Sequence, residues 1–185
     1  MAVTCCDAPG LMPVEQAMEK MLDSIQAITK TQEVGLTDAL DLVLGNDVVS
    51  PINVPGFDNS AMDGYAFSSV NIASFERLKL VGKVYAGDVF SGTVGPGECV
   101  RIMTGAPMPN GGDTVQMQEN VTVIDERYIQ LNAIPYARTH VRYAGEDIQK
   151  NACVLNAGER LKPAHLGLLA SLGVAKVEIV KQLKV

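Results

Sequence analysis

The sequence predicts an α+β fold in which a discontinuous helical domain surrounds an inserted β domain. Helical patterns lie near both ends of the chain, at 13–29 and 163–172, and short alternating apolar segments separated by glycine and proline lie between them. The simplest packing brings the two ends of the chain together. We therefore predict an elongated helical and mixed domain built from 13–50 plus 145–185, a small antiparallel β domain inserted at 51–144, and a leader at 1–12.

The helical segments follow from apolar spacing and from helix start and stop residues. Apolar residues recur every three or four positions over 13–29, and Pro13 suits a first helical position, which predicts an amphipathic helix with one buried stripe. A second, short helix is expected over 39–44, with Gly45 as its left-handed terminator. The last helix is expected over 163–172, before Gly173.

The β-strands are predicted from short apolar or alternating runs bounded by turn residues. Their close spacing favours antiparallel pairing over parallel βαβ units. In the last strand Val177 and Ile179 share one face. The expected strands are 48–49, 65–67, 78–85, 99–103, 114–117, 121–124, 128–131 and 174–185.

Composition narrows the function classes. The net charge of −6 argues against a nucleic-acid binder, since such affinity rests on Lys and Arg. No apolar run reaches the roughly 18 residues of a membrane span, and no secretory signal is recognised at the N-terminus, so we expect a cytoplasmic protein with no membrane partner. The four cysteines lack metal-binding spacing and are expected to be reduced thiols. A phosphorylated small molecule could still bind through local backbone donors, a few cations or a bridging Mg²⁺.

The segment 55–66, PGFDNSAMDGYA, contains two acids, an amide and a hydroxyl among turn residues. Asp63 lies at the junction of this loop with the predicted strand 65–67, where a rigid framework can hold a carboxylate in contact with ligand. The alternative is that Asp58 and Asp63 only stabilise turns.

Two further polar clusters follow along the chain. The segment 101–113 leads from a strand into a Gly/Pro loop that begins at Thr104, whose alternative role is a hydroxyl turn. The segment 141–150 places Asp147 shortly after a glycine, and the alternative is a solvated turn in which Arg142 and Lys150 screen the acids.

Taken together, these clusters resemble the molybdopterin molybdenumtransferase family, which includes MoeA and the E domain of gephyrin. The resemblance rests on VPGFDNSAMDGYA at 54–66, RIMTGAPMP at 101–109 with Gln-Glu at 118–119, GEDI at 145–148 and GLLASLG at 167–173. It covers the chain after the leader, and the first motif has the bacterial form. Full-length members continue into an α/β domain and a small β domain, so we expect this sequence to be an N-terminal part.

The resemblance implies insertion of molybdate into adenylylated molybdopterin, with Mg²⁺ and release of AMP. It implies that Asp63 organises Mg²⁺ or water, that Thr104 bonds substrate or orients Asp63, and that Asp147 has a supporting electrostatic role. Cofactor-binding positions are then Asp58, Asn59 and Ser60.

The resemblance further implies a homodimer in which a partner's third domain completes the cleft. The apolar stripe of the first helix is wide for the chain available to cover it, which also favours a partner surface. Molybdopterin adenylyltransferase is the expected upstream partner. The chain alone is expected to be inactive, and the alternative function is a non-catalytic dimerisation or scaffold module.

Overall fold

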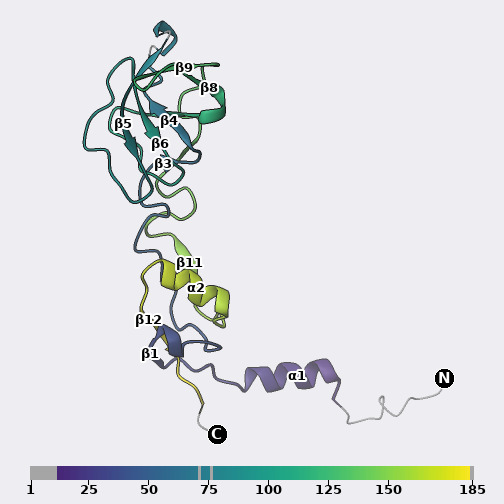
Figure 1. Cartoon of the computed structure of the whole chain (residues 1–185). Helices are drawn as coiled ribbons and strands as arrows, with labels where there is room; N and C mark the ends of the chain where they lie inside the picture. Colours follow the sequence, from purple (N-terminus) through teal and green to yellow (C-terminus); the bar gives the residue numbers. More distant parts are fainter. Residues whose placement is uncertain (1–11, 71, 76, 184–185) are drawn as a thin grey trace, which may run out of the picture. The chain divides into compact units, whose positions relative to one another are not determined.

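The computed structural model describes residues 12–70, 72–75 and 77–183 (Figure 1). The chain forms two compact units, one comprising residues up to Asp47 and from Leu155 onward, the other comprising Val48–Val154. The sequence-based boundaries lay at 50/51 and 144/145. Residues 145–154 belong to the second unit because their backbone bonds to it, for example from Asp147 N to Val54 O at 2.9 Å and from Ser50 N to Ala152 O at 2.8 Å. The predicted leader lies outside the described residues except for Met12.

The first unit is organised around a two-stranded sheet. Strand β1 (Thr31–Gly35) pairs antiparallel with β12 (Lys176–Val180), so that Val34 lies opposite Val177. Helix α2 (Pro163–Ser171) begins at its proline and is followed by Gly173, as predicted. Val177 and Ile179 are both buried, which confirms the predicted apolar face. Strand β1 itself was not predicted. The other buried apolar residues of this unit are Ala39, Leu44, Leu155, Leu161, Leu169 and Leu172.

The predicted helix over 39–44 is wrong. The chain makes one 3₁₀ turn, η2 (Leu36–Asp38), and Asp41 then takes a left-handed φ of 64°. Leu44 N donates to Glu159 O at 2.9 Å, and Leu161 N donates to Leu42 O at 2.8 Å. Pairing with a distant segment thus replaces the local helix. Gly45 is not a helix terminator, since its N–H bonds to Glu178 O at 2.9 Å.

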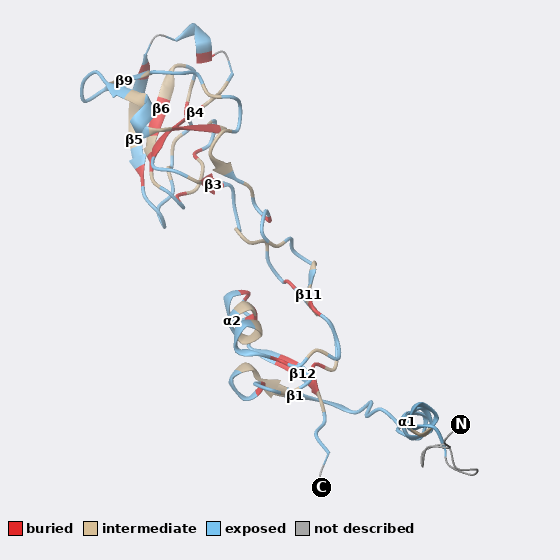
Figure 2. Cartoon of the chain, turned by 90° about the vertical axis from the view of Figure 1, so that its right-hand side faces the viewer, coloured by how far each residue is buried: buried red, intermediate tan, exposed pale blue. Residues whose placement is uncertain are grey.

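Helix α1 (Val14–Asp23) is shorter than predicted, and none of its residues is buried (Figure 2). Its C-terminal turn is closed by Ser24, whose hydroxyl donates to Met21 O at 2.7 Å. The predicted buried stripe is therefore exposed in this chain: Val14, Met18, Met21 and Ile25 are each more than half exposed.

The second unit contains a six-stranded curled mixed sheet in the order β7-β4-β6-β5-β9-β8. The strand positions agree with the sequence within one residue at each end, but the pairing is not wholly antiparallel, because β5 and β6 run parallel. Residues 85–97 form the crossover that a parallel pair requires. The strands are β4 (Gly64–Phe67), β5 (Leu78–Val84), β6 (Glu98–Ile102), β7 (Thr114–Met117), β8 (Val121–Val123) and β9 (Tyr128–Leu131).

Alternate residues of the sheet enter two different apolar clusters. Ala66, Val100 and Ile102 pack in one cluster, whereas Tyr65 and Phe67 pack in the other. Strand β4, which lies between β7 and β6, is thus buried along its whole length.

Two small strand pairs lie outside the six-stranded sheet: β2 (Val48–Val49) with β11 (Cys153–Leu155), and β3 (Asn59–Ser60) with β10 (Val141–Arg142). Short 3₁₀ turns lie at η3 (Ile72–Ser74) and η4 (Gln118–Asn120). In the described part of the chain, no helix is both long enough and apolar enough to cross a membrane.

Candidate functional site

Asp63 and Thr104 are brought together at one end of strands β4 and β6. The register places Gly64 opposite Ile102, so the residues just outside the two strands meet. Thr104 donates two hydrogen bonds to Asp63 Oδ1, one from its backbone N–H and one from its hydroxyl, each 2.8 Å. The backbone bond, followed by the hydroxyl bond, holds the pKa of Asp63 below its usual value. Asp63 is therefore an exposed, ionised carboxylate in a fixed orientation.

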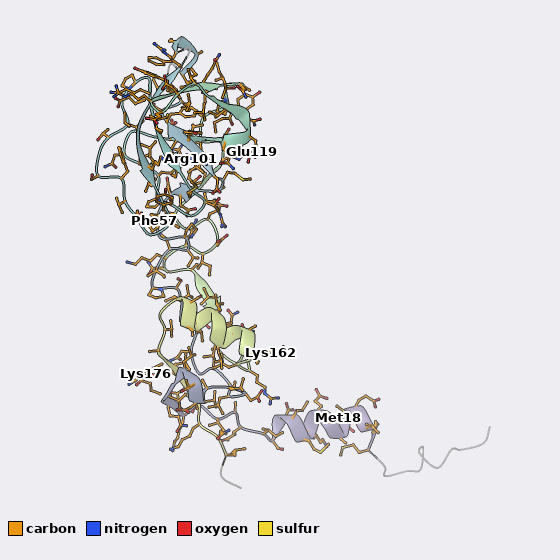
Figure 3. All side chains as sticks on the ribbon, in the orientation of Figure 1. Met18, Phe57, Arg101, Glu119, Lys162 and Lys176 are labelled. Atoms are coloured by element: carbon orange, nitrogen blue, oxygen red, sulfur yellow. The ribbon has the colours of Figure 1, made fainter. Side chains whose placement is uncertain are left out.

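Arg101 connects this carboxylate with the Gln-Glu pair at 118–119. Its guanidinium donates to Gly64 O at 3.3 Å and to Gln118 Oε1, and it lies 4.9 Å from the centre of the Tyr65 ring. Gln118 donates in turn to Glu119 Oε1 at 3.0 Å. Figure 3 labels Arg101 and Glu119, which lie near each other in this unit.

Glu119 is a second ionised acid near Asp63. The hydrogen bond from the Gln118 side chain lowers the pKa of Glu119, the positive charge of Arg101 lowers it further, and the negative charge of Asp63 opposes both. The site thus contains two carboxylates, Asp63 from the first motif and Glu119 from the 3₁₀ turn after β7, and the positive charge of Arg101 favours the ionised form of both.

Asp147 lies in a different local network. Both of its carboxylate oxygens accept from Arg142 Nη2, each at 3.1 Å, and this exposed ion pair lies in the turn after β10. Within the described residues, no hydrogen bond or ion pair links Asp147 to Asp63 or Thr104. The structure therefore brings together two of the three predicted catalytic residues by direct contact and leaves the third apart.

The positions predicted to bind cofactor have specific local roles. Asp58 Oδ1 accepts from Ala144 N at 2.8 Å, which ties the first motif to the third. Asn59 is largely buried and donates to Phe57 O at 3.3 Å. Ser60 is fully buried, and its hydroxyl donates to Met62 O at 2.5 Å. Asn59 and Ser60 thus shape the loop that presents Asp63.

The oxygen donors around Asp63 are those of a partial Mg²⁺ site. No group of three or more His, Cys, Asp or Glu residues suited to a metal occurs in the described residues. Mg²⁺ commonly binds through one or two carboxylates together with substrate phosphates, so a full protein cage is not needed. Asp63 fits this pattern because Thr104 occupies only its Oδ1, and Glu119 provides a second charge nearby.

Arg101 and Glu119 were not among the predicted site residues. Both lie within motifs that the sequence displays, Arg101 at the start of RIMTGAPMP and Glu119 in the Gln-Glu pair. The available signal was that charged residues flank a Gly/Pro loop. Without the sheet register, however, nothing indicated that they face Asp63.

The fold and site place the chain in a known family. Residues 12–173 match the model of the MoeA N-terminal region (domain I and II), and the chain therefore belongs to this family. Among curated relatives, it is 42% identical to a molybdopterin molybdenumtransferase of Haemophilus influenzae over 95% of this chain and 43% of that one. It is 36% identical to molybdopterin molybdenumtransferase 2 of Mycobacterium tuberculosis, over 92% of this chain and 42% of that one.

Solved structures of relatives have the same fold. A crystal structure of the molybdopterin biosynthesis moeA protein from Pyrococcus horikoshii OT3 superposes with a TM-score of 0.84 at 31% identity, over 91% of this chain and 46% of that chain. A second structure of the Pyrococcus protein gives a TM-score of 0.82, also at 31% identity, over 92% and 44% of the two chains. The chain spans less than half the length of the relatives it matches.

Proposed function

We propose that the chain is the N-terminal part of a molybdopterin molybdenumtransferase, which inserts molybdate into adenylylated molybdopterin and releases AMP. The observation that carries the proposal is the exposed Asp63 carboxylate, oriented by two hydrogen bonds from Thr104. Orienting an ionised acid with fixed donors is the kind of preorganisation that electrostatic catalysis requires. A loop that only formed a turn would not need two donors from a segment 41 residues away.

Asp63 is proposed to bind Mg²⁺ or a water molecule through the oxygen that Thr104 leaves available. Mg²⁺ when bound would offset phosphate charge at the linkage that is cleaved. Thr104 acts by keeping Asp63 ionised and in one orientation. Arg101 limits repulsion between Asp63 and Glu119, since it attracts both.

Asp147 is proposed to act from outside this pair, as an electrostatic support paired with Arg142. Asp58 is proposed to contact the substrate while its Oδ1 holds Ala144. Asn59 and Ser60 remain proposed cofactor-binding positions, acting through the loop backbone because their side chains are buried.

The assembly and cellular context belong to the same proposal. We propose a cytoplasmic homodimer that receives its substrate from molybdopterin adenylyltransferase. Because the chain spans less than half of its relatives, we propose that it does not release AMP alone. Catalysis by positioning needs groups on both sides of the reacting phosphate, and a displacement of about 1 Å can cost on the order of a hundredfold.

The test is AMP release from adenylylated molybdopterin in the presence of molybdate and Mg²⁺. The chain is assayed alone and mixed with the domains that follow in the Haemophilus influenzae relative. We expect release only in the mixture and only with the divalent cation. Absence of release from the mixture, under conditions where the intact relative is active, would count against the proposal.

A scaffold or dimerisation module is the second candidate, and the exposed stripe of α1 favours it. The two functions predict different effects of Asp63→Asn. If the chain is a scaffold, the substitution leaves assembly unchanged and no AMP release is observed with or without it. If the chain is part of a transferase, the substitution lowers AMP release.

A further inference from the structure

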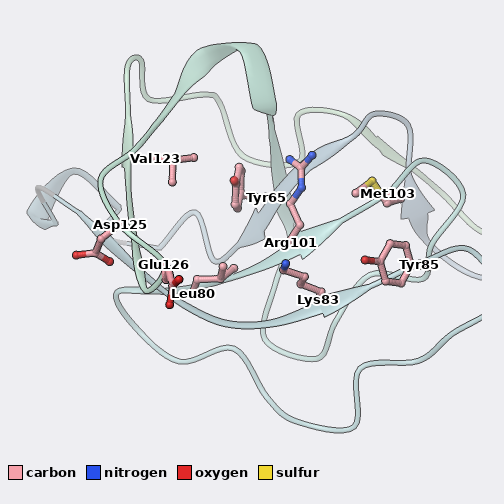
Figure 4. A pocket seen from close by; sticks show the side chains of 9 residues that line it. All are labelled: Tyr65, Leu80, Lys83, Tyr85, Arg101, Met103, Val123, Asp125 and Glu126. Carbon is pink, nitrogen blue, oxygen red and sulfur yellow. The ribbon is translucent and has the colours of Figure 1, made fainter.

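A cavity of about 520 Å³ lies over the sheet of the second unit (Figure 4). Its volume is within the range of pockets that bind small molecules, about 300–1,000 Å³. It shares Arg101 with the Asp63 site. The lining residues contributed by the sheet and its loops are Tyr65, Leu80, Lys83, Tyr85, Arg101, Met103, Val123, Asp125 and Glu126.

The middle of this cavity carries two cations on neighbouring strands. Lys83 of β5 and Arg101 of β6 are direct partners in the parallel register, and Arg101 is in turn the partner of Tyr65 on β4. Neither cation forms an ion pair with a carboxylate of the described residues. Like charges placed directly opposite each other destabilise a sheet, so the arrangement favours an anion bound between them.

A phosphate group suits these two cations. Arg101 is fixed by its bonds to Gly64 O and Gln118 and by the Tyr65 ring. Its side chain therefore loses little conformational entropy when a ligand binds. Lys83 is exposed and can move to meet an anion. Charge-assisted contacts with phosphate are among the stronger hydrogen bonds in proteins.

The two ends of the cavity differ in chemistry. Tyr85, whose side chain is about half exposed, and Met103 lie at one end, where they offer an aromatic and a polarisable apolar surface (Figure 4). Asp125 and Glu126 lie toward the other end. Asp125 Oδ1 accepts from Arg127 N at 2.7 Å and from Tyr128 N at 2.9 Å. The negative charges of Asp125 and Glu126 disfavour a phosphate at this end of the cavity.

We infer that this cavity binds a phosphate monoester that carries a planar heterocyclic ring. The phosphate lies between Lys83 and Arg101, and the ring contacts Tyr85 and Met103 at one end of the cavity. The inference rests on the proposed function, since release of AMP from adenylylated molybdopterin leaves two phosphate monoesters that carry such rings, AMP and the phosphorylated pterin.

The test measures binding to the full chain by isothermal titration calorimetry at low ionic strength. AMP and 6-hydroxymethylpterin phosphate are the two ring phosphates, and adenosine, 6-hydroxymethylpterin and ribose 5-phosphate are the comparison ligands. We expect saturable one-to-one binding of at least one ring phosphate, with loss of either the phosphate or the ring weakening it about tenfold or more. The ring phosphate that binds more tightly identifies which half of the substrate, the nucleotide or the phosphorylated pterin, the cavity binds.

Three variants locate the binding. Lys83→Gln is expected to weaken the ring phosphate about tenfold, and Tyr85→Leu is expected to remove most of the advantage over ribose 5-phosphate. Lys79→Gln is the matched control, because Lys79 lies on the same strand but pairs with Glu98 at 3.8 Å outside the cavity. The affinity of the Lys79→Gln variant for the ring phosphate should stay within about twofold of that of the unchanged chain.

The inference is overturned if neither ring phosphate binds, if Lys83→Gln binds as well as the unchanged chain, or if Lys79→Gln is weakened equally. The proposed function fails separately. AMP release by the domain mixture without ring-phosphate binding overturns only the cavity assignment, whereas ring-phosphate binding without release supports the cavity and contradicts the transferase.

Discussion

Thr104 donates its backbone N–H and its hydroxyl to the same oxygen of Asp63, at 2.8 Å each. One residue therefore fixes the orientation of the carboxylate and favours its ionised form. Because Oδ1 accepts both bonds, the proposed binding of Mg²⁺ or water is assigned to the other oxygen. Substitutions at these two residues can therefore change the charge of the carboxylate and its orientation separately.

The first prediction concerns the charge of Asp63. In Asp63→Asn the amide oxygen can still accept both Thr104 bonds, so the loop keeps its shape while the negative charge is lost. We expect AMP release by the domain mixture to fall by about a hundredfold or more, with Tm changed by no more than a few degrees. Asp88→Asn, an exposed acid outside the site, is the control and should leave both unchanged. Normal turnover in Asp63→Asn, or a loss of many degrees in Tm, would make Asp63 a structural turn residue.

The second prediction concerns the pKa of Asp63. Thr104→Val keeps the backbone donor and the side-chain shape but removes the hydroxyl that stabilises the ionised form. The pKa of Asp63 should therefore rise toward its ordinary value, measured by NMR titration of the side-chain carboxyl carbon. As the solution is acidified, Mg²⁺-dependent AMP release by the domain mixture should then be lost at a higher pH with the variant than with the unchanged chain. In Thr104→Ser, which retains the hydroxyl, the pKa of Asp63 should be the same as in the unchanged chain.

The third prediction uses Cys99 as a probe of unfolding. Cys99 is fully buried in the sheet, and burial, aided by the charge of Glu98, raises the pKa of its thiol to about 12. At pH 8 the thiolate that reacts with iodoacetamide is therefore nearly absent. In a variant with Ser at positions 5, 6 and 153, we expect no alkylation of the native chain and full alkylation in denaturant. Fast labelling of the native state would show that the sheet opens readily.

The fourth prediction concerns Gly64, where β7 lies close to β4. A Cβ added at Gly64 would lie 2.0 Å from the carbonyl oxygen of Gln116, a backbone atom that cannot move aside without disturbing the pairing. We expect Gly64→Ala to lower the free energy of unfolding by about 1–3 kcal/mol, measured in urea. Gly167→Ala, in helix α2 with no atom near the added carbon, is the control and should be neutral or stabilising.

The fifth prediction concerns assembly through α1. If its exposed stripe is the dimer surface, Met18→Asp should shift the chain from dimer to monomer at tens of micromolar, as judged by size exclusion with light scattering. Glu19→Ala, on the same helix but outside the stripe, should leave the mass unchanged. A chain that is monomeric before any substitution would contradict the homodimer.

Much of the local structure could be predicted from the sequence. The strands of the sheet, helix α2 and the turn at Gly173 follow from apolar period and from turn residues, which act over a few positions. Turn residues likewise predict that Asp63 and Thr104 lie on loops at strand ends, as they do in the structure. Prediction from the sequence failed at 39–44, where bonds from Leu44 to Glu159 and from Leu161 to Leu42 outweighed a weak helical pattern.

The partners of these elements were decided only by the tertiary structure. Strand β1 has little pattern of its own and exists because β12 pairs with it, and the parallel pairing of β5 with β6 depends on the path of residues 85–97. The contact of Thr104 with Asp63, and the place of Lys83 beside Arg101, likewise follow from register between strands. The sequence alone determined which candidate residues lie on loops at strand ends, because side-chain type and local turn preference are properties of single positions. Which of them meet was decided by hydrogen bonds between segments far apart in the chain, and local patterns do not encode that choice.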